Sequence, residues 1–236
     1  MAAGLGSRLR AVSDCKPLAQ VGGRSLIEWS IRAAVRAGAS RIVVATGHSA
    51  AQLEAALPAI ALAVGIPVEP ARVADFTITN GHSVLAGAEH IRGDYLLMMA
   101  DHLLSWRLLE MLARQGGTDR GVTLAIDRRI DDPLLDRNDA TWVATDAAGR
   151  IRRIGKFLDK FDAVDCGAFL ATPELAAAIR SAIASGLPGS LSDGMQILAN
   201  TGRAATMPIG DEWWIDVDDP AARERAERLL AERALA

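Results

Sequence analysis

The chain has few cysteines and no long hydrophobic run, and each shortage excludes a class of protein. Its 236 residues contain two cysteines, Cys15 and Cys166, which are too few for a disulfide scaffold and lack metal-ligand spacing. The longest apolar stretch, 55–68, is shorter than the roughly 20 residues that cross a bilayer, and Pro58 and Pro67 lie inside it. The opening residues also lack the charged start and apolar core of a secretory signal. We therefore expect a cytoplasmic protein without membrane insertion.

Histidine and net basic charge are also scarce. The formal net charge is −3, which gives no support for a nucleic-acid or anionic-membrane partner, so any phosphate must be bound by local cations. The histidines have no i, i+4 pairing and no cysteine neighbours, which argues against a zinc site, and they are His48, His82, His90 and His102. For His102 a structural or acceptor-lining role is expected.

The apolar pattern indicates strands alternating with helices. Residues 41–46 and 94–100 are apolar, β-branched runs that predict buried parallel strands. Each follows a segment with helical periodicity, 25–37 and about 83–90, and Gly38 is expected to end the first helix in a left-handed conformation. Half of the residues are apolar and 23% are charged, as in a globular chain that folds.

The second part of the chain continues the alternation. Further elements are predicted as strands at 122–126, 142–145, 151–154 and 164–170, a turn at 146–149, and helices starting at Pro173 and at Asp219-Pro220, the last running to Ala236. The turn joins its neighbouring strands as a hairpin. Strands alternating with helices imply a doubly wound α/β sheet.

A glycine-rich loop near the start carries the first chemical signal. Glycines let backbone N–H groups close on phosphate oxygens, a serine hydroxyl can donate to them, and two cations supply local charge. The residues concerned are Ala3, Gly4, Gly6, Ser7, Arg8 and Lys16. This pattern predicts a triphosphate cradle, although a surface turn is the alternative for the loop taken alone.

The position of this loop in the chain is unusual. A loop of this kind normally follows a buried strand, and here only Met1 and Ala2 precede it. The expectation is that the true start lies upstream or that the first strand was removed.

Residues 2–27 resemble the nucleotidyltransferase superfamily, of the sugar-phosphate nucleotidyltransferase type. The resemblance rests on the AAGxGxRL opening, on Lys16-Pro17-Leu18, and on a glycine followed by Ser25-Leu26-Ile27. It implies a Rossmann-like, doubly wound, mixed and mainly parallel sheet with helices on both faces. No linker divides the chain, so we expect one domain over 1–236. Its nucleotide-binding half would be about 1–115 and its acceptor-binding half about 116–236.

A second block, 79–85, stands where such enzymes carry a glycine-containing turn and a helix that cup the base. The resemblance makes Asn80 and Gly81 nucleotide-binding candidates, with Gly81 close to a pyrimidine. The alternative is a helix N-terminus in which Asn80 or Ser83 is the cap. Both interpretations are compatible.

Asp101 ends the predicted strand at 94–100, where its side chain would project into an active-site crevice. A carboxylate is a hard oxygen ligand suited to Mg²⁺, which typically takes one or two of them together with substrate phosphates. The segment 213–220 resembles the W-x-D-x-x-T/D-P ending of the superfamily, which implies Asp216 as the second ligand. Asp218 lies on the same side of an extended segment and could substitute or help. Asp219 is assigned to capping the last helix.

The chain most resembles inositol-1-phosphate cytidylyltransferases. This resemblance rests on the motifs MADH and WxDVD, on Ile154-Gly-Lys156 and on the segment 162–167. This resemblance implies that Lys156 meets the phosphate of the acceptor and that Asp165 and Gly167 line its pocket. A solvated turn is the alternative for Lys156. Some family members are fused to a membrane-embedded alcohol phosphotransferase, and this sequence contains none, so any such partner would be a separate protein.

The expected reaction joins CTP and inositol 1-phosphate to give CDP-inositol and pyrophosphate, with Mg²⁺ as cofactor. The attacking phosphate oxygen is already ionised, so no general base is needed, and Arg8 and Lys16 would neutralise the developing charge. Alternatives are a phosphocholine, phosphonate or sugar-1-phosphate acceptor, and a catalytically silent regulatory subunit. A catalytically silent subunit is disfavoured, because such a protein would have no need for both the cationic cradle and the pair of carboxylates. A dinucleotide-binding domain is disfavoured because the loop lacks a full GxGxxG.

Overall fold

The computed structural model describes residues 1–9, 13–115, 120–132 and 135–234. Its α-helices are α1 (Leu26–Arg36), α2 (Ala50–Val64), α3 (Gly81–Ala88), α4 (Trp106–Ala113), α5 (Pro173–Ala184), α6 (Leu191–Asn200) and α7 (Pro220–Ala234). Short 3-10 turns cover Ser7–Leu9 and Lys16–Leu18. The strands are β1 (Gln20–Val21), β2 (Arg24–Ser25), β3 (Ile42–Thr46), β4 (Val68–Arg72), β5 (Tyr95–Met98), β6 (His102–Leu104), β7 (Val122–Asp127), β8 (Trp142–Thr145), β9 (Ile151–Gly155), β10 (Ala163–Ala171), β11 (Ala204–Pro208) and β12 (Trp214–Asp216).

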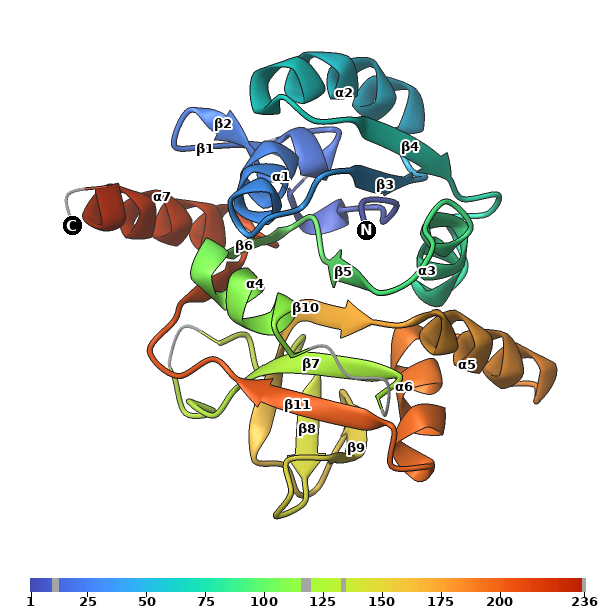
Figure 1. The fold of residues 1–236 in the computed structure, drawn as a ribbon. Helices are drawn as coiled ribbons and strands as arrows, with labels where there is room; N and C mark the ends of the chain where they lie inside the picture. Colours follow the sequence, from blue (N-terminus) through green and yellow to red (C-terminus); the bar gives the residue numbers. More distant parts are fainter. Residues whose placement is uncertain (10–12, 116–119, 133–134, 235–236) are drawn as a thin grey trace.

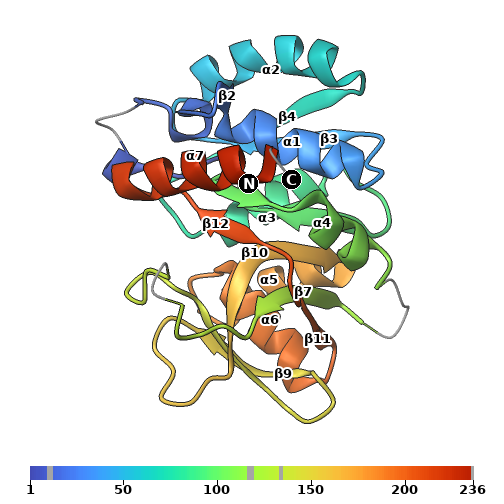
Figure 2. The ribbon, with the colours of Figure 1, turned by 90° about the vertical axis from the view of Figure 1, so that its left-hand side faces the viewer.

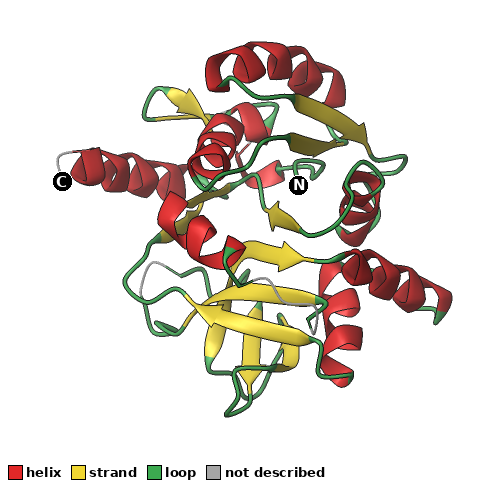
Figure 3. Ribbon diagram, in the orientation of Figure 1, coloured by secondary structure: helices red, strands yellow, loops and turns green. Residues whose placement is uncertain are grey.

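A mixed sheet runs through the middle of the molecule, with helices on both of its faces (Figures 1 and 3). Strand β10 pairs antiparallel with β7, β8 and β5, and β11 pairs parallel with β7. Strands β3 and β4 pair parallel with each other. Met1 and Ala2 connect the two parts: Ala2 N–H donates to Ala45 at 2.9 Å, and Ala100 N–H donates to Met1 at 3.0 Å. A two-residue extended segment therefore lies between β3 and β5.

The alternation of side chains along β7 and β10 explains why helices cover both faces. Leu124 and Ile126 of β7 pack in one cluster with residues of α3, α5 and α6, whereas Ala125 between them packs with the leucines of α4. Phe169 and Ala168 of β10 divide between the same two clusters. A strand buried on both faces reads as a continuous apolar run, as these strands do in the sequence.

Strand β10 carries an irregularity that matters for the site. Asp165 pairs with Ile126 and Phe169 pairs with Leu124, so four steps along β10 match two steps along β7. Gly167 lies inside this bulge with φ +73°, a left-handed conformation that glycine adopts without steric cost. Bulges of this type redirect side chains, and this one turns the first half of β10 toward β8.

The C-terminal segment returns to the N-terminal half of the molecule. Strand β12 pairs antiparallel with β6, and α7 then packs against β1; in Figure 2 this helix lies at the front of the molecule. Asp219 Oδ1 accepts a hydrogen bond from Ala222 N–H at 2.7 Å, which confirms its expected capping role. Val217 and Ala226 are fully buried against Leu9. Residues near the two ends of the sequence thereby share one small core.

The observed elements confirm the predicted alternation, with several differences. The strand at 94–100 runs parallel to Met1–Ala2 and β3, but on its other side it pairs antiparallel with β10. Helix α2 was not predicted, because its sequence is apolar almost throughout and carries Pro58, which lies inside the helix. The prediction also missed strands β1, β2, β4, β6, β11 and β12 and helices α4 and α6. The expected end of the last helix at Ala236 and the expected boundary near 116 lie outside the described residues.

Among the described residues, no helix combines the length and the apolar character that crossing a bilayer requires. Helix α2, which covers most of the longest apolar stretch, is 15 residues long and has a glycine, Gly65, at its C-terminus with φ +76°. Its buried residues, Leu53, Leu57 and Ile60, pack with those of α1 and β3. The apolar stretch is therefore in part a core helix.

Helix α3 begins at a glycine that has no room for a side chain. A Cβ placed on Gly81 would lie 2.0 Å from the carbonyl oxygen of Gly189, whereas a Cβ on Gly87 would meet nothing within 4 Å. We predict that Gly81→Ala lowers the free energy of unfolding by about 1–3 kcal/mol, because the backbone at Gly189 must move. The matched control Gly87→Ala in the same helix should raise it by roughly 0.5–1 kcal/mol. Urea denaturation measures both, and equal effects would contradict the packing argument.

Candidate active site

The glycine-rich loop closes on Lys16, which follows it in the chain. Gly6 has φ +56°, and a Cβ on it would lie 2.5 Å from the Cβ of Lys16. A side chain at this position would therefore force the loop away from Lys16. The backbone of Ala3 accepts a hydrogen bond from His48 N–H at 3.0 Å, which ties the start of the loop to the end of β3. The loop thus lies at the carboxyl edge of the sheet, where open α/β folds bind ligands.

Asp101 and Asp216 meet at this edge although 115 positions separate them in the sequence. Pairing of β6 with β12 sets Asp216 opposite His102, the residue after Asp101. The backbone continues the contact, because Val217 N–H donates to the Asp101 carbonyl at 3.0 Å. The predicted pair of carboxylates is therefore brought together by strand pairing.

Lys16 lies between carboxylates from two other segments. Its Nζ donates to Asp101 Oδ2 at 2.6 Å and also to Asp218, and only 10% of the Lys16 side chain is exposed. Arg8 pairs with Asp218 and with Asp139, and its distance to Asp136 is 3.5 Å. Asp218, which the sequence analysis could not separate from Asp216, therefore contacts both cations of the loop.

His102 connects the carboxylates of the crevice. Its Nδ1 lies 3.0 Å from Asp101 Oδ1 and 3.7 Å from Asp216 Oδ1. Burial disfavours a charged imidazole, but Asp216, Asp101 and Asp165 outweigh it and raise the pKa of His102 to about 9. Burial likewise opposes ionisation of Asp101, yet the hydrogen bond to His102 and the charge of Lys16 lower its pKa below the ordinary value.

An indole holds His102 in place. The Trp214 ring stacks on the His102 ring with centroids 5.6 Å apart and planes 15° apart. Trp214 Nε1 donates to Asp127 Oδ2 at 3.0 Å, and Asp127 is also gripped by both Nε and Nη2 of Arg129. Asp127 is 6% exposed, so this buried carboxylate, at the end of β7, fixes the indole through a charge-assisted network. Sequence reasoning missed Asp127, which forms no motif by itself, and noted Trp214 only as part of the WxDVD motif, without its contact to His102.

Two adjoining chambers open around these residues. One, of about 240 Å³, is lined by the loop residues Ala3, Gly4, Gly6, Arg8 and Lys16. The other, of about 450 Å³, contains the side chains expected to meet an acceptor. The residues that line both chambers are Asn80, Met99, Asp101 and Asp218. Two carboxylates therefore stand where a molecule in one chamber would meet a molecule in the other.

The larger chamber contains Lys156, Asp165 and Gly167. Lys156 pairs with Asp139, and half of its side chain is exposed. Asp165 Oδ1 accepts a hydrogen bond from Gly167 N–H at 2.7 Å, and burial raises the pKa of Asp165 to about 6. A Cβ on Gly167 would lie 2.5 Å from Cδ2 of His102, so the bulge leaves room for the imidazole.

The donor set suits a divalent cation with hard-ligand preference. Ligand atoms of Asp101, His102 and Asp216 lie within 4.8 Å of one another, as do those of Asp139, Asp216 and Asp218. Asp216 belongs to both groups, and its Oδ1 is buried with no hydrogen-bond partner. A buried carboxylate oxygen without a hydrogen bond is costly, and a metal ion would satisfy it. The residues present therefore fit Mg²⁺, with Asp101 and Asp216 as carboxylate ligands.

The segment 79–85 does not contain the side-chain cap that was the alternative interpretation of Asn80. Asn80 precedes α3, but its Oδ1 accepts from Leu191 N–H at 2.9 Å, and no side-chain hydrogen bond caps the helix. Gly81 packs against the backbone of Gly189, and this close packing explains why the position holds a glycine. Base contacts by Asn80 and Gly81 stay predictions, as does a phosphate contact by the Ser7 hydroxyl, which lies outside the described side chains. The acidic segment 131–139 was the overlooked signal for Asp139.

Sequence comparison finds curated relatives that align with nearly the whole chain. The bifunctional IPC transferase and DIPP synthase of Rubrobacter xylanophilus is 31% identical over 98% of this chain and 51% of its own length. The chain thus spans about half the length of the curated relatives it matches.

Solved structures share the fold at low sequence identity. The inositol-1-phosphate CTP transferase of T. maritima superimposes with a TM-score of 0.84 at 21% identity, covering 98% of this chain and 92% of that one. A UDP-glucose pyrophosphorylase complexed with UDP-glucose gives 0.79 at 17% identity, covering 98% and 97%. These neighbours confirm the doubly wound mixed fold expected from the sequence.

A family description also matches the sequence directly. Residues 1–164, which include the glycine-rich loop, Lys16 and Asp101, match the MobA-like NTP transferase domain. This match covers more than half of the chain and confirms the nucleotidyltransferase resemblance drawn from residues 2–27. The chain belongs to the MobA-like NTP transferase family.

Proposed function

We propose that this protein is a cytidylyltransferase that joins CTP to inositol 1-phosphate, giving CDP-inositol and pyrophosphate. The observation that carries the proposal is the meeting of Lys16 with Asp101 and Asp218 between two chambers, one lined by the loop and one by Lys156. The names of the relatives supply the substrates: an inositol-1-phosphate CTP transferase shares the fold, and an IPC transferase shares the sequence.

In this proposal the chain's residues bind and orient two phosphorylated molecules. The triphosphate lies along the loop 3–9, where backbone N–H groups, Arg8 and Lys16 meet its oxygens. Lys156 draws the acceptor's phosphate into the larger chamber. A phosphate oxygen of the acceptor then forms a bond to the α-phosphorus while the bond to the pyrophosphate oxygen breaks.

Charge governs how the site binds its substrates. Asp101, Asp216 and Asp218 would repel a triphosphate, and Lys16 and Arg8 alone offset only part of that charge. A bound Mg²⁺ supplies neutralisation of the carboxylates and of the phosphate oxygens that carry charge in the transition state. The ion pairs of Lys16 and Arg8 hold both cations beside the crevice, ready to exchange carboxylate partners for phosphate oxygens.

The proposed reaction requires no proton transfer to or from a side chain of the protein. The phosphate of the acceptor is ionised at neutral pH, so alignment and charge stabilisation account for the rate. Trp214 and Asp127 hold His102, which in turn orients Asp101. We assign to these three residues a positioning role.

The expected surroundings of the enzyme are part of the same proposal. Mg²⁺ as the cofactor, a cytoplasmic location and a phospholipid-precursor role of the product are proposed from the sequence and the donor set. A membrane alcohol phosphotransferase that consumes the CDP-alcohol is the proposed downstream partner. The DIPP synthase in the name of the longer relatives supports a coupled second step.

A substrate panel tests the proposal. With Mg²⁺ present, we predict pyrophosphate release from CTP and inositol 1-phosphate, and turnover at least about tenfold slower with UTP, ATP or GTP. The acceptors to compare are phosphocholine, an aminoalkyl phosphonate and several sugar 1-phosphates. The likeness to a UDP-glucose pyrophosphorylase makes UTP with glucose 1-phosphate the main rival pair. Release from that pair alone would replace the substrates, and release from no pair would contradict the enzymatic proposal.

The carboxylate pair has its own test. We predict that Asp101→Asn and Asp216→Asn each lower turnover on the order of 10²-fold or more, because each variant removes a carboxylate that would hold the Mg²⁺ that stabilises the transferring phosphate. Asp211→Asn is the matched control, since Asp211 is an exposed residue just before β12. Steady-state rates and thermal midpoints should be measured together. Activity retained in both site variants would contradict the assignment.

A further inference from the structure

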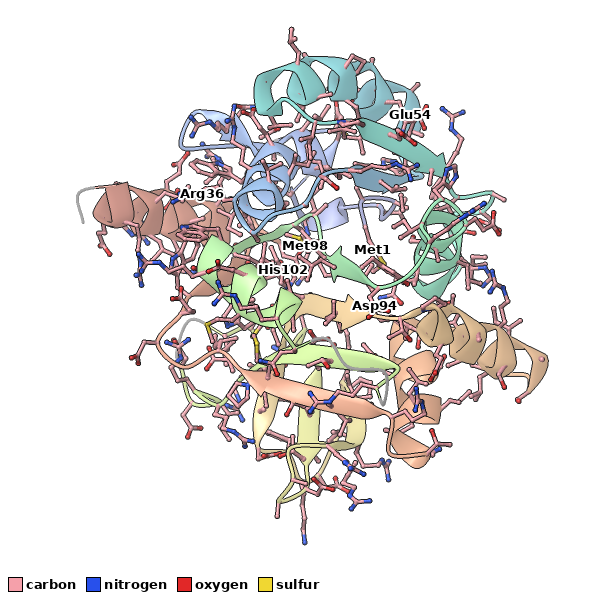
Figure 4. The ribbon with its side chains drawn as sticks, in the orientation of Figure 1. Met1, Arg36, Glu54, Asp94, Met98 and His102 are labelled. Atoms are coloured by element: carbon pink, nitrogen blue, oxygen red, sulfur yellow. The ribbon has the colours of Figure 1, made fainter. Side chains whose placement is uncertain are left out.

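Helix α7 forms one wall of the larger chamber. Its sequence holds four arginines and three glutamates, and Figure 4 shows the helix at the left of the view with many side chains that end in nitrogen. The residues of α7 that line the chamber are Ala222, Arg225, Leu229 and Arg233. They follow one another at spacings of three and four, so they share one face of the helix. The chamber therefore receives two of the four guanidinium groups.

A neighbouring face of α7 holds the helix in place. Ala226 and Leu230 pack with Leu9 in one small core, and Trp213 packs against the same cluster. The guanidinium of Arg233 lies over the Trp213 ring, 5.7 Å from its centroid, in a cation–π contact. The wall is therefore anchored to the fold, and its arginines are presented to the chamber from a fixed support.

The cations around the crevice differ in whether a carboxylate already holds them. Lys16, Arg8 and Lys156 each pair with at least one aspartate. Arg225 has no ion pair within the described part of the chain, and its Nε is buried without a hydrogen-bond partner. A buried donor of a charged group that lacks an acceptor is costly. An anion bound in the chamber would supply the missing acceptor.

The position of Arg225 indicates which anion this is. Among the described residues that line the two chambers, Arg225 belongs to the larger one and not to the smaller one beside the glycine-rich loop. The triphosphate is assigned to the smaller chamber, so an anion beside Arg225 belongs to the other substrate. We propose that Arg225 binds the phosphate of the acceptor, a monophosphate ester, through Nε–H and an adjacent Nη–H. This inference rests on the proposed function, in which the acceptor is phosphorylated.

A guanidinium suits this task better than an ammonium group. Its planar fork gives two parallel hydrogen bonds to one phosphate group. The chamber also contains Asp139, Asp216 and Asp218, whose charge would repel a phosphate. Lys156 must exchange Asp139 for the phosphate, whereas Arg225 offsets part of the repulsion without giving up a carboxylate. In this proposal Lys156 draws the acceptor in and Arg225 holds it.

Two methionine variants of α7 test the assignment. Arg225→Met keeps an apolar stem and removes every hydrogen-bond donor of the side chain. Arg228→Met is the matched control, since Arg228 is an exposed residue of the same helix that does not line the chamber. We predict that Arg225→Met raises the KM for inositol 1-phosphate about tenfold or more, the cost of losing a hydrogen bond to a charged group. The KM for CTP should change less than about threefold, because a contact with one substrate is lost. The control should leave both values unchanged.

Two measurements without turnover complete the test. A phosphorus NMR titration with inorganic phosphate, in the absence of nucleotide, should show binding to Arg225→Met that is about tenfold or more weaker than binding to Arg228→Met. The thermal midpoint of unliganded Arg225→Met should equal or exceed that of the wild type, since the variant removes a buried charged group without a partner. An arginine with a merely structural role would lower the midpoint when replaced.

The outcomes separate this inference from the proposed function. An unchanged KM for inositol 1-phosphate in an active Arg225→Met enzyme would overturn the inference and leave the proposed function in place. Equal phosphate binding by the two variants, no phosphate binding by the wild type, or a lowered midpoint of Arg225→Met would also overturn it. So would a selective rise in the KM for CTP, because Arg225 would then serve the triphosphate. Phosphate binding that depends on Arg225 in a chain that turns over no acceptor would support the phosphate site and contradict only the proposed reaction.

Discussion

The arrangement of the active site depends on the attraction between Lys16 and the carboxylates of Asp101 and Asp218. Lys16 follows the glycine-rich loop, Asp101 lies in the turn between β5 and β6, and Asp218 lies in the segment after β12. Because the Lys16 side chain is largely buried, this pairing is less screened by solvent than a surface ion pair. Breaking it without a replacement would leave buried charge uncompensated. Phosphate oxygens and a divalent cation are the partners that can replace both sides at once.

The rest of the fold sets these charges at one edge. Pairing of β12 with β6 brings Asp216 beside Asp101, and the bulge at Gly167 turns Asp165 and β8 around the larger chamber. The stack of Trp214 on His102 gives the carboxylates a fixed neighbour. A site built on strand ends and supported by buried hydrogen bonds is well suited to hold two phosphorylated molecules in line.

Much of this arrangement could be predicted from the sequence, and the remainder has identifiable reasons. Local pattern and the family resemblance together singled out Lys16, Asp101 and Asp216, and the fold does bring these residues to one edge, while their roles stay predictions. The roles of Asp127, Asp139 and Trp214 depend on pairing between segments far apart in the chain, which no local pattern records. Helix α2 was missed because it is apolar almost throughout, so periodicity could not identify it.

The most direct measurement is a Mn²⁺ titration of the protein by electron paramagnetic resonance, with and without CTP, in the wild type and in Asp216→Asn. If the carboxylates and cations of the crevice serve a metal-bound triphosphate, CTP should tighten Mn²⁺ binding. The substitution should then weaken that binding by more than about tenfold, at least the cost of losing an outer-shell partner of a metal. Mn²⁺ binding that is indifferent both to CTP and to the loss of the Asp216 charge would contradict the account.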